Sequence, residues 1–157
     1  MKRVLLLFSH LAALFFGFML GIYVLPILTQ PDSPSIASVT ADANQIVVKG
    51  TFDKDRQDSD LFHWGEGDIS FTNDSAMFIG ELAPGPDYKL YLSPIYVETE
   101  ADFNTNKANM LQVGDVKTFD RFLLSLPEGT DLSQYTAAII WCESFGEFIT
   151  SAKLQAN

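Results

Sequence analysis

The sequence predicts an all-β domain, an antiparallel β-sandwich, that follows one N-terminal transmembrane helix. Residues 4–25 form a run of 22 residues without a charged side chain. After residue 45 the chain changes to short β-branched and aromatic runs separated by Gly, Pro, Asn and Asp, which is typical of strands joined by turns. This later part shows almost no helical period, so a sandwich or a barrel is expected, and we favour the sandwich.

The N-terminal run is long enough to cross a membrane. At about 1.5 Å per residue, 22 residues span roughly 33 Å, against about 30 Å of bilayer hydrocarbon. Pro26 predicts the end of this helix. Lys2 and Arg3 come directly before the run, and basic residues favour the cytoplasmic side. We therefore expect a single-pass membrane protein with its C-terminal domain on the extracytoplasmic side.

A cleaved signal peptide is the competing interpretation. Its apolar core should be about 7–15 residues, followed closely by small residues. Here the run is longer, and the small-x-small pattern Ala41-Asp42-Ala43 lies far beyond its end. An uncleaved signal anchor is therefore expected. Gly17 and Gly21 have the GxxxG spacing that lets two helices approach closely, so the anchor is either passive or supports a homodimer.

The chain divides into the anchor at 1–28, a linker at 29–44 and one domain at 45–157. The linker is polar and contains two prolines, which predict an extended segment that holds the domain off the membrane. All 20 acidic residues but only eight of the ten basic residues follow residue 30, a formal charge of −12. This charge argues against binding to nucleic acid, whose phosphates are bound by Lys and Arg.

Six to nine strands are expected in the domain. A strand at 45–52 precedes a charged loop at 53–60 and a strand at 61–71, in which Gly65 and Gly67 indicate a bend or bulge. A turn at 73–75, a strand at 76–82, a turn at 84–87 and a strand at 88–97 follow. Residues 98–112 are polar and predicted irregular. The strand pattern resumes at 113–126, 135–148 and 149–154.

Cys142 is the single cysteine, so no internal disulfide can form. Residues 137–141 are apolar at both parities, which predicts a central strand buried on both faces. Cys142 then lies where this strand nears the rim of the domain. Free cysteine is among the most buried residue types, so a packed core thiol and a functional thiol are both open interpretations.

His63 is the one histidine outside the anchor and is flanked by Phe62 and Trp64. It is either a hydrogen-bonded strand histidine or a partner of Cys142 across the sandwich. Such a pair would be a thiolate and an imidazole, or two ligands of a metal or haem. The sequence contains neither CxxC nor CxxCH, so a thioredoxin-type pair and covalent haem have no support. Two ligands do not make a structural zinc site, and no metal site is predicted.

Four aspartates lie close together in the charged loop, at positions 53, 55, 58 and 60. Carboxylates at such spacing can bind calcium. However, Asp58 stands where the helix-loop-helix calcium loop requires glycine. A solvated loop is therefore expected.

Four segments of the domain together resemble one family, the DM-thirteen domain, an electron-transfer domain also found in Skeletor-type animal proteins. They span about residues 45–154 and include GPDxxxYL followed by IIWC, a specific combination in that order. The segments are Gly50-Thr51-Phe52 with His63 and Gly65, then residues 85–92, then Tyr135 with residues 139–142, and finally Phe145 with Ala152 and Leu154. The resemblance implies a small β-domain built around one hallmark cysteine, which Cys142 matches. It also implies electron transfer through the bare thiol or through a prosthetic group such as haem.

Two functions are therefore open. The first is a membrane-anchored domain with a redox role at Cys142, with His63 and Trp141 shaping its surroundings and an unknown protein as redox partner. Cys142 would also hold the haem or metal if such a cofactor binds. The second is a non-catalytic adhesion or binding module in which Cys142 only packs in the core. Neither interpretation identifies an enzyme reaction.

Overall fold

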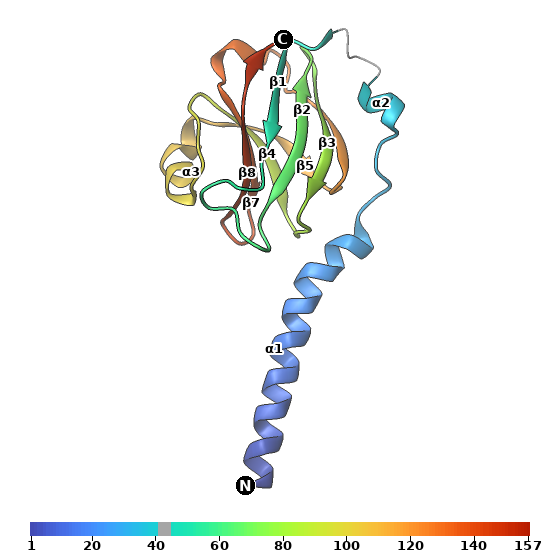
Figure 1. The fold of residues 1–157 in the computed structure, drawn as a ribbon, viewed down its shortest axis with the longest axis vertical. Helices are drawn as coiled ribbons and strands as arrows, with labels where there is room; N and C mark the ends of the chain where they lie inside the picture. The colour runs from blue at the N-terminus through green and yellow to red at the C-terminus, as the bar shows by residue number, and fades with distance from the viewer. Residues whose placement is uncertain (41–44) are drawn as a thin grey trace.

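The computed structural model describes residues 1–40 and 45–157. Figure 1 shows a long N-terminal helix that leads to a β-rich domain. The helices are α1 (Lys2–Thr29), α2 (Ile36–Thr40) and α3 (Glu100–Asn106), with 3-10 turns at Lys107–Asn109 and Leu132–Gln134. The strands are β1 (Val48–Phe52), β2 (Gly65–Phe71), β3 (Ser75–Leu82), β4 (Tyr88–Ser93), β5 (Leu111–Val116), β6 (Arg121–Ser125), β7 (Ala137–Cys142), β8 (Glu147–Lys153) and β9 (Gln155–Ala156).

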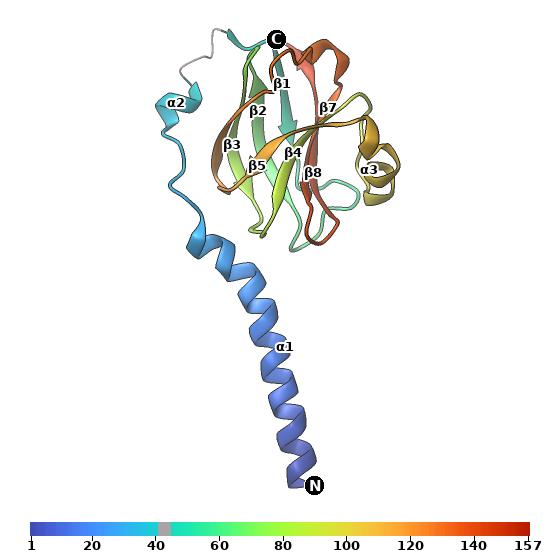
Figure 2. The same ribbon diagram turned by 180° about the vertical axis from the view of Figure 1, so that it is seen from behind.

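The nine strands form two antiparallel sheets that pack face to face, so the predicted all-β sandwich is confirmed. One sheet has the order β6-β3-β2-β1-β9, and the other has the order β5-β4-β7-β8. Figures 1 and 2 show the two sheets as layers seen from opposite sides. Because sequential strands often change sheet, contacts between the layers join segments that are distant in the sequence.

The core lies between the two sheets. Along β4, Leu90 and Leu92 point into it and are fully buried. In the other sheet, the Phe78 ring stacks on Phe122 at 5.0 Å between centroids and meets Phe52 edge-on at 5.6 Å. Aromatic pairs of this kind contribute about 0.5–1.5 kcal/mol beyond their buried area. The apolar side chains that alternate along each strand and point inward therefore hold the two sheets together.

Strand β7 is buried on both faces, as its sequence predicted, because a helix covers its outer face. Every residue of β7 is buried. On the outer face, the Phe103 ring of α3 stacks on Trp141 at 3.9 Å with 12° between the planes. The prediction that residues 98–112 are irregular is wrong, since α3 begins inside them. Thr99 caps this helix by accepting a hydrogen bond from the Asp102 N–H, a signal that the sequence already contained.

Two further sequence-based expectations differ from the structure in the strands. The bulge expected as one possibility at Gly65 and Gly67 is absent, because β2 pairs with β3 in unbroken register along its length. Gly67 serves instead for close approach: its φ is 131°, and a Cβ there would lie 2.4 Å from the Ile79 carbonyl oxygen. The strand pattern expected at 113–126 corresponds to two strands, β5 and β6, and β5 begins earlier than expected, at Leu111.

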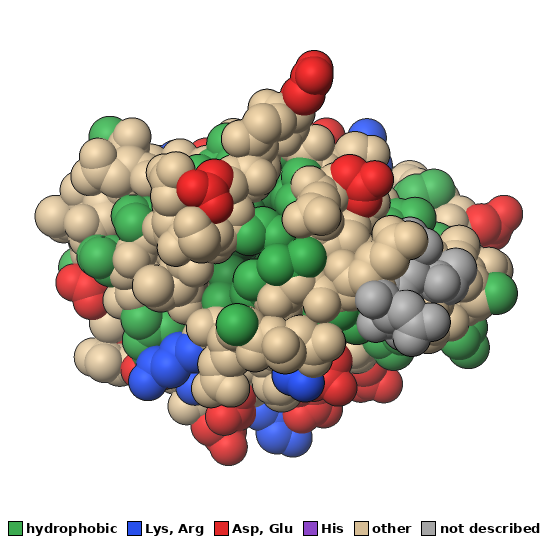
Figure 3. All heavy atoms as spheres, turned by 90° about the horizontal axis from the view of Figure 1, so that it is seen from above, with side chains coloured by type: hydrophobic (Ala, Val, Ile, Leu, Met, Phe, Trp, Pro, Cys, Tyr) green, Lys and Arg blue, Asp and Glu red, His purple; other side chains and the backbone are tan. Residues whose placement is uncertain are grey.

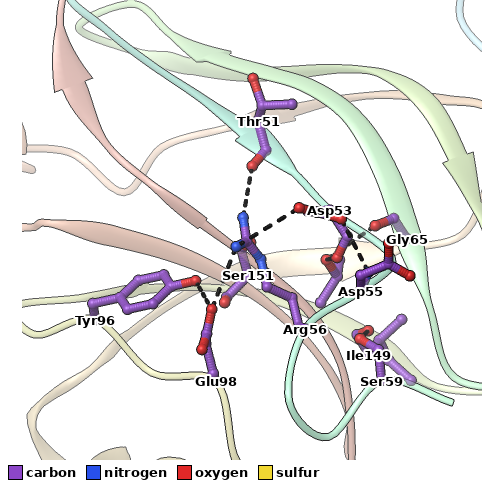
Figure 4. A network of polar contacts seen from close by, with 11 residues as sticks. Thr51, Asp53, Asp55, Arg56, Ser59, Gly65, Tyr96, Glu98, Ile149 and Ser151 are labelled. Atoms are coloured by element: carbon purple, nitrogen blue, oxygen red, sulfur yellow. Dashed lines mark hydrogen bonds and ion pairs between the residues drawn. The ribbon is translucent and has the colours of Figure 1, made fainter.

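The loop at 53–64 is held against the domain by one arginine (Figure 4). The Arg56 guanidinium donates to the Ser151 carbonyl at 2.9 Å and to the Thr51 carbonyl at 3.3 Å, and pairs with Glu98 at 3.3 Å. Ser59 donates to the Ile149 carbonyl at 2.8 Å. These bonds satisfy strand-edge carbonyls that would otherwise need water, so the loop has a fixed position.

Helix α1 continues past Pro26, so the predicted end of the helix is wrong. Helix α1 ends at Thr29, and the Gln30 N–H donates to the Pro26 carbonyl at 2.9 Å. Proline lacks only its own N–H, and its carbonyl still accepts a bond from the next turn. Figure 1 shows α1 changing direction in these last turns. The helix is long and apolar enough to cross a membrane.

The segment after α1 lies along the edge of the sandwich instead of forming a free spacer. Val39 of α2 is buried, the Ser33 hydroxyl donates to Asp120, and the Arg121 guanidinium donates to the Pro34 carbonyl at 3.1 Å. The expectation of an extended segment at 29–44 is therefore wrong for residues 36–40, which form α2. The pattern Ala41-Asp42-Ala43 lies outside the described residues.

The two ends of the sandwich differ in what lies beside them. The loops at 53–64, 83–87, 117–120 and 143–146 lie at the end that faces α1 (Figure 2). At the opposite end, Leu126 and Leu132 close the core between β6 and β7. Figure 3 shows that opposite end, with hydrophobic side chains near its centre and acidic side chains around them. Cys142, as the last residue of β7, belongs to the α1 end.

Replacing Phe103 with Ala should lower the free energy of unfolding by about 3–5 kcal/mol, the cost of removing a fully buried aromatic ring. The Phe103 ring stacks on Trp141, so the substitution should weaken the packing on the outer face of β7. Urea unfolding of the detergent-solubilised full-length protein, followed by tryptophan fluorescence, measures it. The control is Leu123→Ala, at a surface position that is 42% exposed, which should change the value by less than about 0.5 kcal/mol. Equal effects of the two substitutions would contradict the role given to α3.

Candidate functional site at Cys142

Cys142 lies at the end of a core strand with its side chain in the interior. It is a free thiol and only 2% exposed. In the sheet it pairs with Tyr88 on β4 and with Glu147 on β8. Its side chain belongs to the main core between the sheets. The prediction that Cys142 sits where a buried strand reaches the rim is confirmed.

The turn after Cys142 is held by the segment that begins β4. The Glu143 N–H donates to the Asp87 carbonyl oxygen at 3.0 Å, and the Ser144 hydroxyl donates to the Asp87 carboxylate at 2.8 Å. The turn closes through the Gly146 N–H, which donates to the Cys142 carbonyl at 2.9 Å. Gly146 has a φ of 70°, which favours glycine. We call these contacts of Asp87 with Glu143 and Ser144 the Asp87 clasp.

Gly85 and Lys89 hold the Asp87 clasp in place. A Cβ on Gly85 would lie 2.3 Å from the Tyr88 ring, so only glycine lets that ring pack over the backbone. The Lys89 ammonium lies 2.8 Å from both Asp87 and Asp115. The hydrogen bond from Lys89, with help from Ser144 and against the effect of burial, holds the pKa of Asp87 below its usual value. Asp87 is therefore a carboxylate anion that accepts a hydrogen bond from Ser144 on one side and from Lys89 on the other.

Two opposing effects act on the Cys142 thiol. Burial raises its pKa, because the low-dielectric core disfavours the thiolate. The backbone N–H groups of Phe145, Asp87 and Ser144 lower it by offering hydrogen bonds to the sulfur. Burial is the larger effect, so the closed site holds a neutral thiol. Burial likewise raises the pKa of the neighbouring Tyr88 hydroxyl well above its usual range.

Trp141 lies on the opposite face of β7 from Cys142. Its indole is covered by Phe103, and the Phe103 ring in turn meets Tyr91 edge-on at 5.1 Å. The Tyr91 hydroxyl donates to Glu143, and Lys107 pairs with Glu143 at 2.7 Å. Trp141 is thus a neighbour of Cys142 along the chain, and Glu143 links this outer cluster to the turn that closes the thiol site.

His63 has an acidic partner in its own loop. Its ring Nδ1 lies 3.1 Å from an Asp60 carboxylate oxygen, and the Asp60 carboxylate also accepts the His63 backbone N–H at 2.8 Å. Among the described residues, no hydrogen bond joins His63 to Cys142. The pairing of these two residues stays a prediction.

The loop aspartates bond to nearby backbone groups. Asp53 accepts the Asp55 N–H at 3.0 Å, and Asp58 accepts the Glu100 N–H at 2.8 Å. Within residues 1–40 and 45–157, no group of three or more His, Cys, Asp or Glu side chains is arranged to hold a metal ion.

A haem does not fit the arrangement around Cys142. The side chain is packed in the core, and it lines none of four shallow surface hollows in the described part of the chain. A haem bound to this sulfur would have to displace core side chains such as Leu90 and Ile140. The chemistry of the site is therefore derived from the thiol alone.

The residues of the Asp87 clasp were not identified as site residues from the sequence. Asp87 and Ser144 are 57 positions apart, and neither has the local spacing of a catalytic motif. The available signal was Gly85-Pro86-Asp87 itself, which was part of the family resemblance. A glycine and an aspartate held in place beside a hallmark cysteine segment indicate a contact between the two segments.

Replacing Ser144 with Ala should increase the rate at which iodoacetamide labels Cys142 in the folded protein. The substitution removes one hydrogen bond of the Asp87 clasp, worth about 0.5–1.5 kcal/mol, so the open turn should be populated about 2- to 10-fold more. Intact-mass analysis over time gives the rate. Ser133→Ala removes a comparable hydroxyl bond, to Asp131 at 2.7 Å, at the far end of the domain and should leave the rate unchanged. An unchanged rate in Ser144→Ala would show that the clasp does not close the site.

The stability of the domain should fall at alkaline pH because of Cys142. A raised thiol pKa means that the folded state favours the neutral form. This contribution is complete below the ordinary thiol pKa of about 8.5 and is lost as the pH rises through the higher folded value. The free energy of unfolding of the wild type, less that of Cys142→Ala, should therefore decline above about pH 8.5. A difference that does not change with pH would contradict the raised pKa of the thiol. If His63→Ala leaves the pH dependence of this difference unchanged, His63 does not act on Cys142.

No curated protein and no solved structure is significantly similar to this chain. A family model described as electron transfer DM13 matches residues 51–154, more than half of the chain. The matched region includes the Gly85-Pro86-Asp87 segment and the Cys142 strand that the clasp joins. The resemblance inferred from the sequence is confirmed, and the chain belongs to the DM13 electron-transfer family.

Proposed function

We propose that this protein is a membrane-anchored electron-transfer domain in which Cys142 is the redox group. One observation carries the proposal: two family segments far apart in the sequence meet at this sulfur. Tyr88 of one segment pairs with Cys142 in the sheet, and Asp87 beside it accepts hydrogen bonds from Glu143 and Ser144 in the turn that follows Cys142. Backbone hydrogen bonds from Phe145, Asp87 and Ser144 lower the thiol pKa, so they favour the release of the thiol proton that must accompany the loss of an electron.

The buried position limits the chemistry that the thiol can perform. With a single cysteine in the chain, oxidation ends in a bond to a sulfur of another molecule, in the addition of oxygen to the sulfur, or in the loss of one electron. The first two require a reagent to touch the sulfur. A second sulfur cannot reach Cys142 while the Asp87 clasp is closed, but an electron can leave without contact. In the proposed step the thiol gives one electron to an oxidised protein partner and one proton to solvent at the rim, which leaves a neutral sulfur radical. A reduced protein partner then returns one electron, and solvent returns one proton, to restore the thiol.

Membrane anchoring is proposed from α1. The helix is long and apolar enough to span a bilayer, and Lys2 and Arg3 at its start favour a cytoplasmic N-terminus. The β-sandwich would then lie on the extracytoplasmic side. Gly17 and Gly21 leave open space beside the helix, which would allow the α1 of a second copy to pack there.

A second candidate is a non-catalytic adhesion or binding module. It is favoured by the 2% exposure of Cys142 and by the raised pKa of its thiol, since both are typical of a core cysteine. In that case, the N–H groups around the sulfur would serve only to close the turn.

Voltammetry of the full-length protein in nanodiscs separates the two candidates. The proposal expects a redox wave in the wild type that is lost in both Cys142→Ser and Cys142→Ala. Cys142→Ala keeps the site apolar, whereas Cys142→Ser leaves a buried hydroxyl at a cost of about 1–3 kcal/mol if it finds no partner, so a loss in both variants is not an effect of unfolding. A wave that persists in Cys142→Ala would place the redox group elsewhere. A wild type without a wave, labelled by thiol reagents only after unfolding, would establish the packing role.

A further inference from the structure

The α1 end of the sandwich carries large apolar side chains exposed at the tips of two neighbouring loops. Leu61 is 80% exposed and Phe62 is 58% exposed in the loop at 53–64, and Phe145 is 52% exposed in the turn between β7 and β8. The loop at 53–64 is bonded to β8, the strand that follows this turn, through the hydrogen bond from Ser59 to the Ile149 carbonyl. We call Leu61, Phe62 and Phe145 the apolar tip. Exposed apolar side chains that gather at the tips of loops are typical of surfaces that bind a protein or a membrane.

A contact between the apolar tip and α1 fixes the depth of the tip relative to a bilayer. The Phe62 ring meets the Tyr23 ring edge-on, with 6.4 Å between centroids and 79° between planes. Tyr23 lies near the end of the uncharged run at 4–25, where tyrosines of membrane helices sit at the level of the lipid headgroups. If α1 spans the membrane, Phe62 lies at that same level.

The end of α1 also lies beside the segment that begins β4. Pro26, Thr29 and Gln30 line one side of a hollow, and Gly85 and Tyr88 line the other. Together with the contact between Tyr23 and Phe62, this places the domain directly at the end of the helix. The apolar tip therefore faces the surface from which α1 emerges.

We propose that the apolar tip inserts into the headgroup region of the bilayer and docks the domain with its Cys142 end against the membrane. The proposal rests on the proposed membrane anchoring of α1. A lipid surface is the occupant that fits, because Tyr23 and Phe62 share the depth at which amphipathic and aromatic side chains are stable in lipid. A redox partner of Cys142 then has to approach along the membrane.

The charges around the apolar tip specify the kind of lipid. The loop at 53–64 has four aspartates against Lys54 and Arg56, and the turn that carries Phe145 is flanked by Glu143 and Glu147. Anionic headgroups attract basic residues and are repelled by this surface. The tip is therefore suited to zwitterionic lipid such as phosphatidylcholine.

Tryptophan quenching in the full-length protein tests the docking. In a Trp64→Phe background, Phe62→Trp places a reporter in the apolar tip, and Leu123→Trp places a matched one on β6, where Leu123 is 42% exposed. Trp141 is buried and contributes equally to both proteins. In vesicles of phosphatidylcholine brominated near the headgroup, quenching at position 62 should exceed quenching at position 123 severalfold. Leu61→Trp serves as a second reporter if Phe62→Trp does not fold.

The outcomes separate the docking from the anchor. Proteins that float with the vesicles but show equal quenching at positions 62 and 123 overturn the docking and leave the anchor standing. Proteins that do not float overturn the anchor, and the docking with it. Position 62 shielded from bromolipid, together with crosslinking between copies through the tip, identifies a second copy as the occupant and overturns the lipid proposal. Quenching that is unchanged when half the lipid is phosphatidylglycerol overturns the preference for zwitterionic lipid.

Discussion

Strand β7 is apolar on both faces, and the rest of the domain is arranged to cover it. An antiparallel sheet commonly leaves one face in water, but Ile139 and Trp141 point to the outer face and are buried there. Helix α3 supplies the cover through Phe103, stacked on Trp141. A helix of seven residues does not form stably by itself in water, so this contact stabilises the helix as much as the strand. The opposite sheet covers the inner face of β7, where Ala138, Ile140 and Cys142 lie.

The end of this strand is where the fold and the candidate chemistry meet. Cys142 inherits the low-dielectric surroundings of the core, which favour the neutral thiol, and backbone N–H groups at the rim, which favour the thiolate. Burial and backbone hydrogen bonding both act on the thiol because Cys142 is the last residue of β7. One position earlier, the backbone N–H groups are used in the hydrogen bonds of the sheet. Asp87 holds the turn closed with bonds to Glu143 and Ser144, and Lys89 keeps Asp87 ionised. Access to the thiol is therefore linked to a small polar cluster at the surface.

The same end of the sandwich lies next to α1, so the two ends of the domain have different surroundings. The thiol site and the exposed side chains of Leu61, Phe62 and Phe145 are at this end, while Leu126 and Leu132 close the core at the other. The segment after α1 runs along the sheet edge, tied to it through Asp120 and Arg121. Because this segment is bound to the sandwich, it limits how freely the domain can turn about the end of the helix.

Sequence alone determined the features that depend on local composition. The length of the uncharged run defined the apolar helix, the alternation of side chains defined the sandwich, and the doubly apolar run before Cys142 defined a buried strand. Tertiary structure decided what depends on distant partners. The helix α3, the straight register at Gly67, the docking of residues 33–40 and the Asp87 clasp all arise from contacts across the fold. Asp87 and Ser144 are 57 positions apart, and no local periodicity encodes such a pair, because the free energy of the contact exists only after both sheets have formed.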